Sequence, residues 1–162
     1  MIDIDKTARD VVRLLRERGL RVAFAESCTG GMISAAITSV PGSSAVLEAC
    51  VVTYANWAKE KYAGVTNETL AAHGAVSAET ALAMANGIRL ETGSDIGGGV
   101  TGIAGPDGGS DEKPVGTVYI AVSLEGESQV LRLVMNRGDR QSLRAETTRQ
   151  TLVLLRDFLR RN

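Results

Sequence analysis

The chain has 162 residues, of which 44% are hydrophobic and 23% are charged, and these values are typical of one globular domain that buries its own core. The formal net charge of -1 provides no strong basic field, which argues against nucleic acids and anionic membranes as partners. The start of the chain lacks the basic and apolar segments of a signal peptide, and no apolar run approaches the roughly 20 residues of a membrane span. We therefore expect a single cytoplasmic domain over residues 1–162, in which Cys28 and Cys50 stay reduced.

The first part of the chain alternates between helix and strand patterns. Residues 4–18 carry apolar side chains at steps of three and four and predict an amphipathic helix. A short strand is predicted over residues 21–27 and a second helix over residues 29–39. Residues 46–56 are rich in β-branched side chains and predict a second strand, which is followed by a turn of helix at 57–62.

Two further helices are predicted next, and both follow residues that cap helices well. Thr66 precedes a short helix over residues 68–72, and Ser77 precedes a longer helix. One face of this longer helix carries Ala78, Ala81, Ala85 and Ile88. Residues 94–102 then predict a buried strand with three consecutive glycines, which usually mark the close approach of another backbone or of a ligand.

The last part of the chain predicts a hairpin and a helix. Residues 115–124 and 129–136 form strand patterns on either side of a short turn, which indicates an antiparallel pair. Asp139 can cap a final helix, whose apolar stripe is formed by Leu152, Leu155, Phe158 and Leu159. Together these elements predict an α/β fold, a single-domain α/β/α layered arrangement with a mixed β-sheet that includes an antiparallel hairpin.

The stretch AESCTGG, residues 25–31, places a serine in a glycine-rich turn between a predicted strand and a predicted helix. Ser27 is a candidate nucleophile, and the amides from Cys28 to Gly31 are expected to face outward at a helix N-terminus, where they would stabilise an oxyanion or a phosphate. Gly30 and Gly31 would also let a substrate approach the backbone. The same residues fit a plain N-cap followed by a glycine turn.

The stretch TYANWAKEKYAG, residues 53–64, offers candidates for proton transfer. Tyr54 and Lys59 can project to the same edge of the sheet as Ser27. A desolvated lysine can act as a general base, a tyrosine hydroxyl can relay protons, and Ser-Lys hydrolases need no histidine. The alternative is a solvated lysine and a tyrosine at an interface.

Other kinds of site find little support. His73 is the only histidine and falls at a helix end, so a Ser-His-Asp triad and a zinc site are both disfavoured. The glycine-rich loop over residues 101–118 can cradle a polar ligand through its amides, although a plain long turn fits as well. It has neither a G-K-[ST] nor a GxGxxG pattern, so nucleoside triphosphates are not indicated. Its acidic residues, Asp107, Asp111 and Glu112, are more typical of a solvated loop than of a magnesium site.

Five stretches stand in order between the first and the last predicted helix: AESCTGG, VVTYANWAKEKYAGV, HGAVS, TGIAGPDGGSDEKPVGTVYIA and the GDR of residues 138–140. Together they resemble the CinA C-terminal domain family, and specifically its stand-alone members, the nicotinamide-nucleotide amidohydrolases (NMN deamidases). The resemblance implies hydrolysis of nicotinamide mononucleotide to nicotinic acid mononucleotide and ammonia, a step of pyridine nucleotide salvage in NAD metabolism. It implies a small-molecule partner and no metal or organic cofactor, and it leaves the oligomeric state open, a homo-oligomer included. Larger family members carry a preceding molybdopterin-binding-like domain, for which this chain is too short.

The resemblance also implies roles for particular residues. The catalytic serine of the family falls on Ser27, and its tyrosine and lysine fall on Tyr54 and Lys59. The residues expected to hold the substrate are Thr29, Gly30, Gly31, Thr101, Gly102, Ile103, Ala104, Gly105 and Arg140. The forked guanidinium of Arg140, close to the start of the final helix, suits a phosphate.

Two other classes of function stay open. The first is a non-catalytic nucleotide-binding module of the competence- or damage-inducible kind, in which the same loops hold a ligand without hydrolysis. The second is a cysteine amidase that uses Cys28. If Ser27 and Cys28 follow strand alternation, however, the Cys28 side chain points away from that of Ser27 and becomes a buried, inert thiol.

Overall fold

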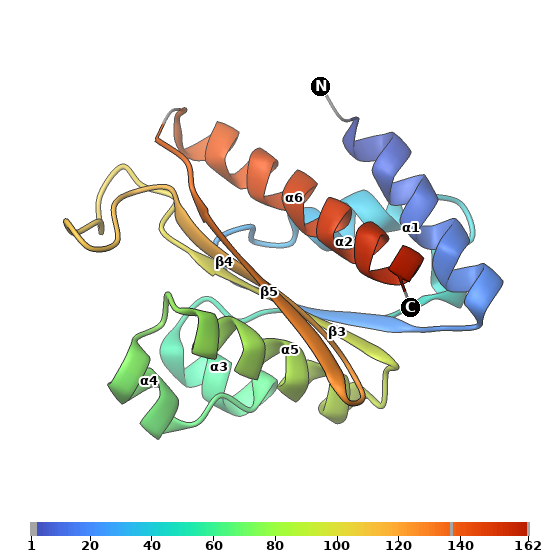
Figure 1. Ribbon diagram of the computed structural model, residues 1–162, viewed down its shortest axis with the longest axis horizontal. Coiled ribbons are helices and arrows are strands. Elements are labelled where there is room, and N and C mark those ends of the chain that lie inside the picture. The colour runs from blue at the N-terminus through green and yellow to red at the C-terminus, as the bar shows by residue number, and fades with distance from the viewer. Residues whose placement is uncertain (1–2, 137, 162) are drawn as a thin grey trace.

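A mixed β-sheet forms the middle layer of the computed structural model, which describes residues 3–136 and 138–161 (Figure 1). Within these residues the strand order is β2-β1-β3-β4-β5. The strands are β1 (Val22–Glu26), β2 (Leu47–Val52), β3 (Ile96–Gly102), β4 (Thr117–Leu124) and β5 (Glu127–Val134). β1 runs parallel to β2 and β3, whereas β4 is antiparallel to β3 and to β5. The predicted mixed sheet and its antiparallel hairpin are therefore confirmed.

Helices cover both faces of the sheet (Figure 1). One face carries α1 (Ile4–Arg18), α2 (Met32–Thr38) and α6 (Arg140–Arg161), and the other carries α3 (Asn56–Ala63), α4 (Asn67–His73) and α5 (Ala78–Thr92). A single 3₁₀ turn, η1 (Ser43–Ala45), leads from α2 to β2. The alternation of β1 separates the two cores, because Val22 and Phe24 pack with α1, α2 and α6 while Ala23 and Ala25 pack with α5. No helix in the described part of the chain is both long and apolar enough to cross a membrane.

The three predicted capping residues act as expected, and Asp3 is a further cap that the sequence did not single out. Asp3 accepts a hydrogen bond from the amide of Asp5 at the start of α1. Thr66 and Ser77 accept from the amides of Thr69 and Thr80 at the starts of α4 and α5. Asp139 Oδ1 accepts from the amide of Ser142 at 2.8 Å, which caps the beginning of α6.

Most elements differ from the sequence prediction by one or two residues at an end, and two boundaries differ by more. Helix α2 begins at Met32 rather than at residue 29, because Gly30 and Gly31 have φ values of 58° and 95° and form a turn. Strand β2 ends at Val52, where the amide of Thr53 makes a last hydrogen bond to the carbonyl of Glu26 at 2.8 Å. The chain then leaves the sheet and turns into α3.

The three glycines of β3 allow close packing on both faces of the strand. A Cβ added at Gly97 would lie 1.9 Å from the carbonyl oxygen of Ala85, and one added at Gly99 would lie 2.2 Å from that of Ala81. A Cβ at Gly98 would lie 2.3 Å from the ring of Phe24. Of the two explanations for these glycines, the approach of another backbone is confirmed, since helix α5 lies directly against them.

Candidate active site

The parallel strands bring three segments to one edge of the sheet. Ser27 follows β1, Tyr54 follows the end of β2, and the loop that begins at Ile103 follows β3. A pocket of about 220 Å³ opens at this edge. The predicted site residues that line it are Ser27, Tyr54, Lys59, Thr101, Gly102, Ala104, Gly105 and Arg140. Parallel strands end on the same side, so this meeting point follows from the topology.

A buried lysine lies beside the serine. Lys59, on α3, is only 2% exposed, and its Nζ lies 3.2 Å from Ser27 Oγ. Nζ also donates to the backbone carbonyl oxygens of Thr53 at 2.8 Å and Tyr54 at 3.2 Å. A neutral amine has two hydrogens and one lone pair, so the two carbonyls can take both hydrogens and leave the lone pair for the hydroxyl proton of Ser27. The contacts of Lys59 therefore suit a general base.

The surroundings of Lys59 favour its neutral form. Burial lowers the pKa of its amine below the ordinary lysine value. Among the described residues, no carboxylate lies within ion-pair distance of Nζ, so the ammonium form lacks the partner that would offset its desolvation. A lysine in this setting is more easily deprotonated than one on the surface.

Tyr54 is at the site but turns its hydroxyl toward another group. Arg140 donates to Tyr54 Oη at 2.8 Å and to the carbonyl oxygen of Gly105 at 2.6 Å. The Tyr54 side chain is 58% exposed and stands at the rim of the pocket. Between the two candidate bases, Lys59 is thus the one in direct contact with Ser27.

Glu26 is a residue of this site that the sequence did not single out. Its side chain is completely buried directly before Ser27. It accepts hydrogen bonds from the amides of Gly31, Ile33 and Ser34 and from the hydroxyl groups of Thr29 and Ser34, at distances of 2.7 to 3.3 Å. The carboxylate thereby caps the N-terminus of α2 and holds the turn behind Ser27 in place.

These bonds change the expected anion site. The amide of Gly31 is already bonded to Glu26, and the amide of Gly30 donates to the carbonyl oxygen of Ser27 at 3.0 Å. The prediction that both amides are free to hold an oxyanion is therefore wrong. The amides of Cys28 and Thr29, which also lie close enough to the Cys28 sulfur to favour its thiolate, are then the remaining candidate donors next to Ser27.

A second residue that the sequence did not reveal holds the other side of this turn. Arg144, on α6, donates to the carbonyl oxygens of Cys28 and Thr29, both at 3.0 Å. A Cβ added at Gly30 would lie 3.0 Å from its guanidinium, so the side chain of Arg144 rather than a substrate occupies the space over this glycine. Arg144 lies one helical turn after Arg140, and this spacing is the only signal the sequence gives for it.

The remaining predicted residues lie outside the lining of the pocket. Thr29 is fully buried with its hydroxyl on Glu26, and Gly30 and Gly31 belong to the turn described above. Ile103 donates to the carbonyl oxygen of Thr117 and accepts from the amide of Gly116. A direct role in substrate binding stays a prediction for these four residues.

Cys28 is a poor nucleophile in this structure. It is 5% exposed and packs in the core formed with α1, α2 and α6. Burial raises the pKa of its thiol to about 11, so the thiol is protonated near neutral pH. The structure thus agrees with an inert thiol beside the candidate serine.

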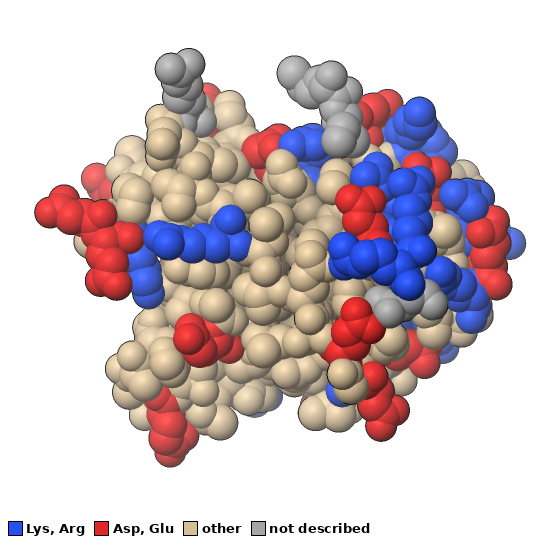
Figure 2. Space-filling view, viewed as in Figure 1, with Lys and Arg blue, Asp and Glu red and all other residues tan. Residues whose placement is uncertain are grey.

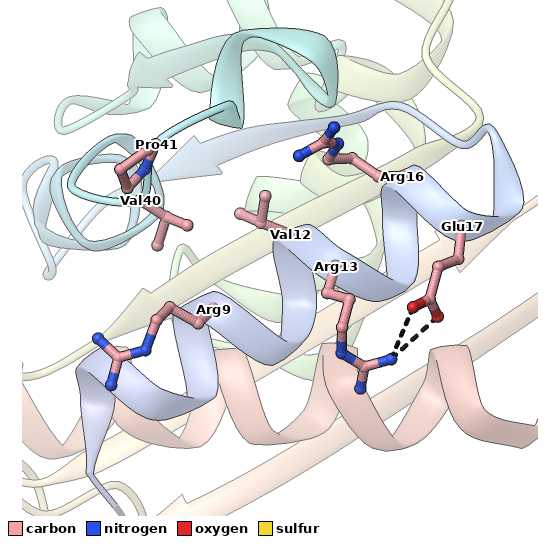
Figure 3. A pocket seen from close by; sticks show the side chains of 7 residues that line it. All are labelled: Arg9, Val12, Arg13, Arg16, Glu17, Val40 and Pro41. Carbon is pink, nitrogen blue, oxygen red and sulfur yellow. Dashed lines mark hydrogen bonds and ion pairs between the residues drawn. The ribbon is translucent and has the colours of Figure 1, made fainter.

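A larger pocket, of about 480 Å³, lies elsewhere, between α1 and the loop after α2 (Figure 3). Exposed arginines line it, and one of them, Arg13, is paired with Glu17 at 2.9 Å. Basic side chains also gather at the end of the molecule where α1 and the end of α6 lie, with acidic side chains among them (Figure 2). The lining of this pocket contains no serine, cysteine or lysine. A still larger pocket, of about 660 Å³ between the starts of α1 and α6, contains Ser142 but no cysteine or lysine, so the smaller pocket at Ser27 is the candidate active site.

Comparison with known proteins matches the chain to one family. The sequence pattern of the CinA C-terminal domain matches residues 4–159. A CinA-like protein from Anaeromyxobacter sp. (strain K) is 52% identical over 157 residues, which cover 96% of this chain and 38% of that protein. A putative competence-damage inducible protein from Moorella thermoacetica is 49% identical over 147 residues, 91% of this chain and 35% of that protein. The chain therefore spans well under half the length of these curated relatives.

Solved structures show the same fold. The competence/damage inducible protein CihA from Agrobacterium tumefaciens has a TM-score of 0.92 and 43% identity, with 96% of this chain and 94% of that chain covered. A competence-damaged protein (CinA) superfamily protein from Escherichia coli has a TM-score of 0.90 and 31% identity, with 95% and 90% covered.

Proposed function

Because the chain belongs to the CinA C-terminal domain family, we propose that it hydrolyses the amide of nicotinamide mononucleotide to nicotinic acid mononucleotide and ammonia. The observation that carries this proposal is the contact of 3.2 Å between Ser27 Oγ and the buried amine of Lys59. The names of the relatives speak of CinA or of competence and damage induction and state no reaction. The proposed activity therefore rests on the chemistry of the pocket and on the motif resemblance.

In the first half of the proposed reaction, Ser27 Oγ attacks the amide carbon while Lys59 Nζ accepts the hydroxyl proton. The carbonyl oxygen becomes an oxyanion, which the amides of Cys28 and Thr29 can stabilise because they directly follow the nucleophile. The Lys59 ammonium then gives its proton to the departing nitrogen, and ammonia leaves. The product of this half is an ester between Ser27 and the nicotinic acid moiety.

In the second half, a water molecule attacks the ester carbonyl, and Lys59 again accepts a proton. Collapse of the second tetrahedral intermediate breaks the ester bond and returns the proton to Ser27 Oγ. Nicotinic acid mononucleotide is released and both side chains regain their starting state. The pair of carbonyls from Thr53 and Tyr54 keeps Lys59 aligned in both halves.

Arg140 is the proposed anchor for the substrate phosphate. Its guanidinium bonds to two neutral oxygens, Tyr54 Oη and the carbonyl oxygen of Gly105, and to no carboxylate among the described residues. A phosphate dianion forms stronger, charge-assisted bonds than these neutral acceptors do. The net charge of the chain, -1, offers an anion no general attraction, so a specific donor of this kind is needed.

The test is release of ammonia from nicotinamide mononucleotide by the purified protein, with binding measured by calorimetry. The wild type should release one ammonia per nicotinic acid mononucleotide formed. Ser27→Ala should lose activity by roughly 10⁴-fold or more while its circular dichroism spectrum is unchanged, because the nucleophile works as part of a unit. Cys28→Ala is the matched neighbour and should keep most activity.

The other outcomes separate the alternatives. Retained turnover in Ser27→Ala would overturn the serine mechanism. A folded but inactive Cys28→Ala, together with an active Ser27→Ala, would support the cysteine amidase. Binding of the mononucleotide without any ammonia in the wild type would support a non-catalytic nucleotide-binding module.

A further inference from the structure

The loop that leaves β3 is fixed to the walls of the pocket at both of its ends. At its start, Arg140 donates to the carbonyl oxygen of Gly105 at 2.6 Å. At its end, Lys113 Nζ donates to the carbonyl oxygens of Val76 at 2.7 Å and His73 at 3.2 Å. Val76 is itself part of the pocket lining. Residues 106–112 between these two points are exposed, and one of them, Asp107, belongs to the pocket lining.

This loop brings a carboxylate to the pocket. Asp107 lines it, whereas Asp111 and Glu112, further along the same loop, do not. Asp107 is the only acidic side chain in the lining, which lies wholly within the described residues. The two basic side chains of the lining, Lys59 and Arg140, are bonded to other groups and are not within ion-pair distance of Asp107.

The charge of this carboxylate matches one feature of the proposed substrate. The ring of nicotinamide mononucleotide is a pyridinium with a fixed positive charge, and the amide that reacts is attached to this ring. Lys59, when protonated, and Arg140 would repel such a ring. A carboxylate in the same small pocket offsets this repulsion, and it attracts a cationic ring more strongly than a neutral ring of the same shape.

We propose that Asp107 is a specificity-determining residue that makes the pocket select amides on positively charged pyridinium rings over amides on neutral rings. This inference rests on the proposed function, because it concerns the same pocket and the same substrate. In this arrangement the negatively charged phosphate of the substrate binds Arg140, and its positively charged ring lies near Asp107.

The test compares two ligands that differ in ring charge. Nicotinamide mononucleotide and its reduced form share the amide, the ribose and the phosphate, but the dihydropyridine ring of the reduced form is neutral. Dissociation constants are measured by calorimetry in a Ser27→Ala background, so that the different chemical reactivity of the two rings does not enter. The oxidised form should bind about tenfold more tightly than the reduced form, a ratio that corresponds to about 1.4 kcal/mol.

The variant and its control lie on the same loop. Asp107→Asn should weaken binding of the oxidised form about tenfold and change that of the reduced form by less than about twofold. Asp111→Asn should leave both constants unchanged, because Asp111 does not line the pocket. The preference for the oxidised form should also shrink at high salt in the protein that keeps Asp107, a readout that does not depend on the variant's folding.

The two proposals fail in different ways. Equal weakening of both ligands by Asp107→Asn, or a preference that does not change with salt, would overturn the role of Asp107 while ammonia release by the wild type still supported the hydrolase. Charge-selective binding through Asp107 in a wild type that releases no ammonia would support Asp107 and overturn the hydrolase.

Discussion

Replacement of Glu26 should reveal how much the turn behind Ser27 depends on one buried carboxylate. Glu26 accepts five hydrogen bonds from residues 29–34. Hydrogen bonds to a charged group contribute about 1.5–3 kcal/mol each, but five bonds to one carboxylate are not additive, and desolvation of the carboxylate opposes them. Removing one partner of a buried charged contact costs about 3–5 kcal/mol, and we expect Glu26→Ala to lower the free energy of unfolding by about this amount.

This loss is large enough to measure by thermal unfolding. For a chain of this size, 1 kcal/mol shifts Tm by about 2–4 °C, so Glu26→Ala should lower Tm by about 6–20 °C. Glu26→Gln keeps the shape of the side chain and one carbonyl oxygen, but its NH₂ group would face backbone and hydroxyl donors. This variant should therefore lower the free energy of unfolding by about 1–3 kcal/mol. Both variants should also lower kcat more than they raise KM, because the turn carries the proposed nucleophile, Ser27.

Glu48 provides the matched control for this experiment. It forms an ion pair with Arg21 at 2.8 Å on the surface, and Glu48→Gln should cost no more than about 1 kcal/mol. If Glu26→Ala unfolded within about 2 °C of the wild type, like the control, the hydrogen bonds of Glu26 would contribute no net stability and the argument would be refuted.

Three further substitutions test the site. Lys59→Arg should lower kcat/KM by about 10²–10⁴-fold, because arginine stays protonated and cannot accept a proton; near-normal turnover would reduce the lysine to an electrostatic aid. In the wild type, kcat/KM should rise with pH as Lys59 loses its proton, with a midpoint below the ordinary lysine value of about 10.4, because burial lowers the pKa of Lys59 and the proposed mechanism uses the neutral amine. A rise centred at or above the ordinary lysine value would contradict this. Arg140→Ala should raise KM for the mononucleotide and affect nicotinamide riboside, which lacks the phosphate, much less; equal proportional losses would exclude the phosphate role. Cys28→Ala should keep most activity and lose about 1–2 kcal/mol of stability in urea unfolding, whereas a stability equal to that of the wild type would mean that the thiol packs loosely.

Local patterns were sufficient for most of the fold. The first helix follows from apolar side chains at helical spacing, and it occupies Ile4–Arg18 as predicted. The hairpin β4-β5 follows from two strand patterns around a short turn, with Leu124 paired to Glu127 at its end. The start of α2 was placed three residues too early, because sequence periodicity does not reveal that Gly30 and Gly31 adopt positive φ.

The candidate site was predictable only where topology decides it. Ser27, Tyr54 and Lys59 could be brought together from sequence, because β1 and β2 are parallel neighbours and their carboxyl ends meet. Arg144 could not be found in this way, since its bond to the carbonyl oxygen of Cys28 joins residues that lie 116 positions apart. Glu26 was equally hidden, because a carboxylate at the end of a strand pattern gives no sign that it will fold back onto the next helix.

The bonds of Glu26 also decide what the AESCTGG turn contributes to chemistry. A helix N-terminus attracts anions, and at α2 the protein's own carboxylate fills that place, so no substrate anion is needed or accommodated there. The backbone donors next to Ser27 are then the amides of Cys28 and Thr29, and the carbonyls of these two residues are fixed by Arg144. The carbonyl of Cys28 shares its peptide plane with the amide of Thr29, so Arg144 fixes that amide. The amide of Cys28 shares its plane with the carbonyl of Ser27, which the amide of Gly30 fixes at 3.0 Å. Both amides are thus kept in a constant orientation, which is what stabilisation of an oxyanion requires. Cys28, which is also part of the pocket lining, therefore contributes to the proposed reaction through its backbone, while its buried thiol packs in the core.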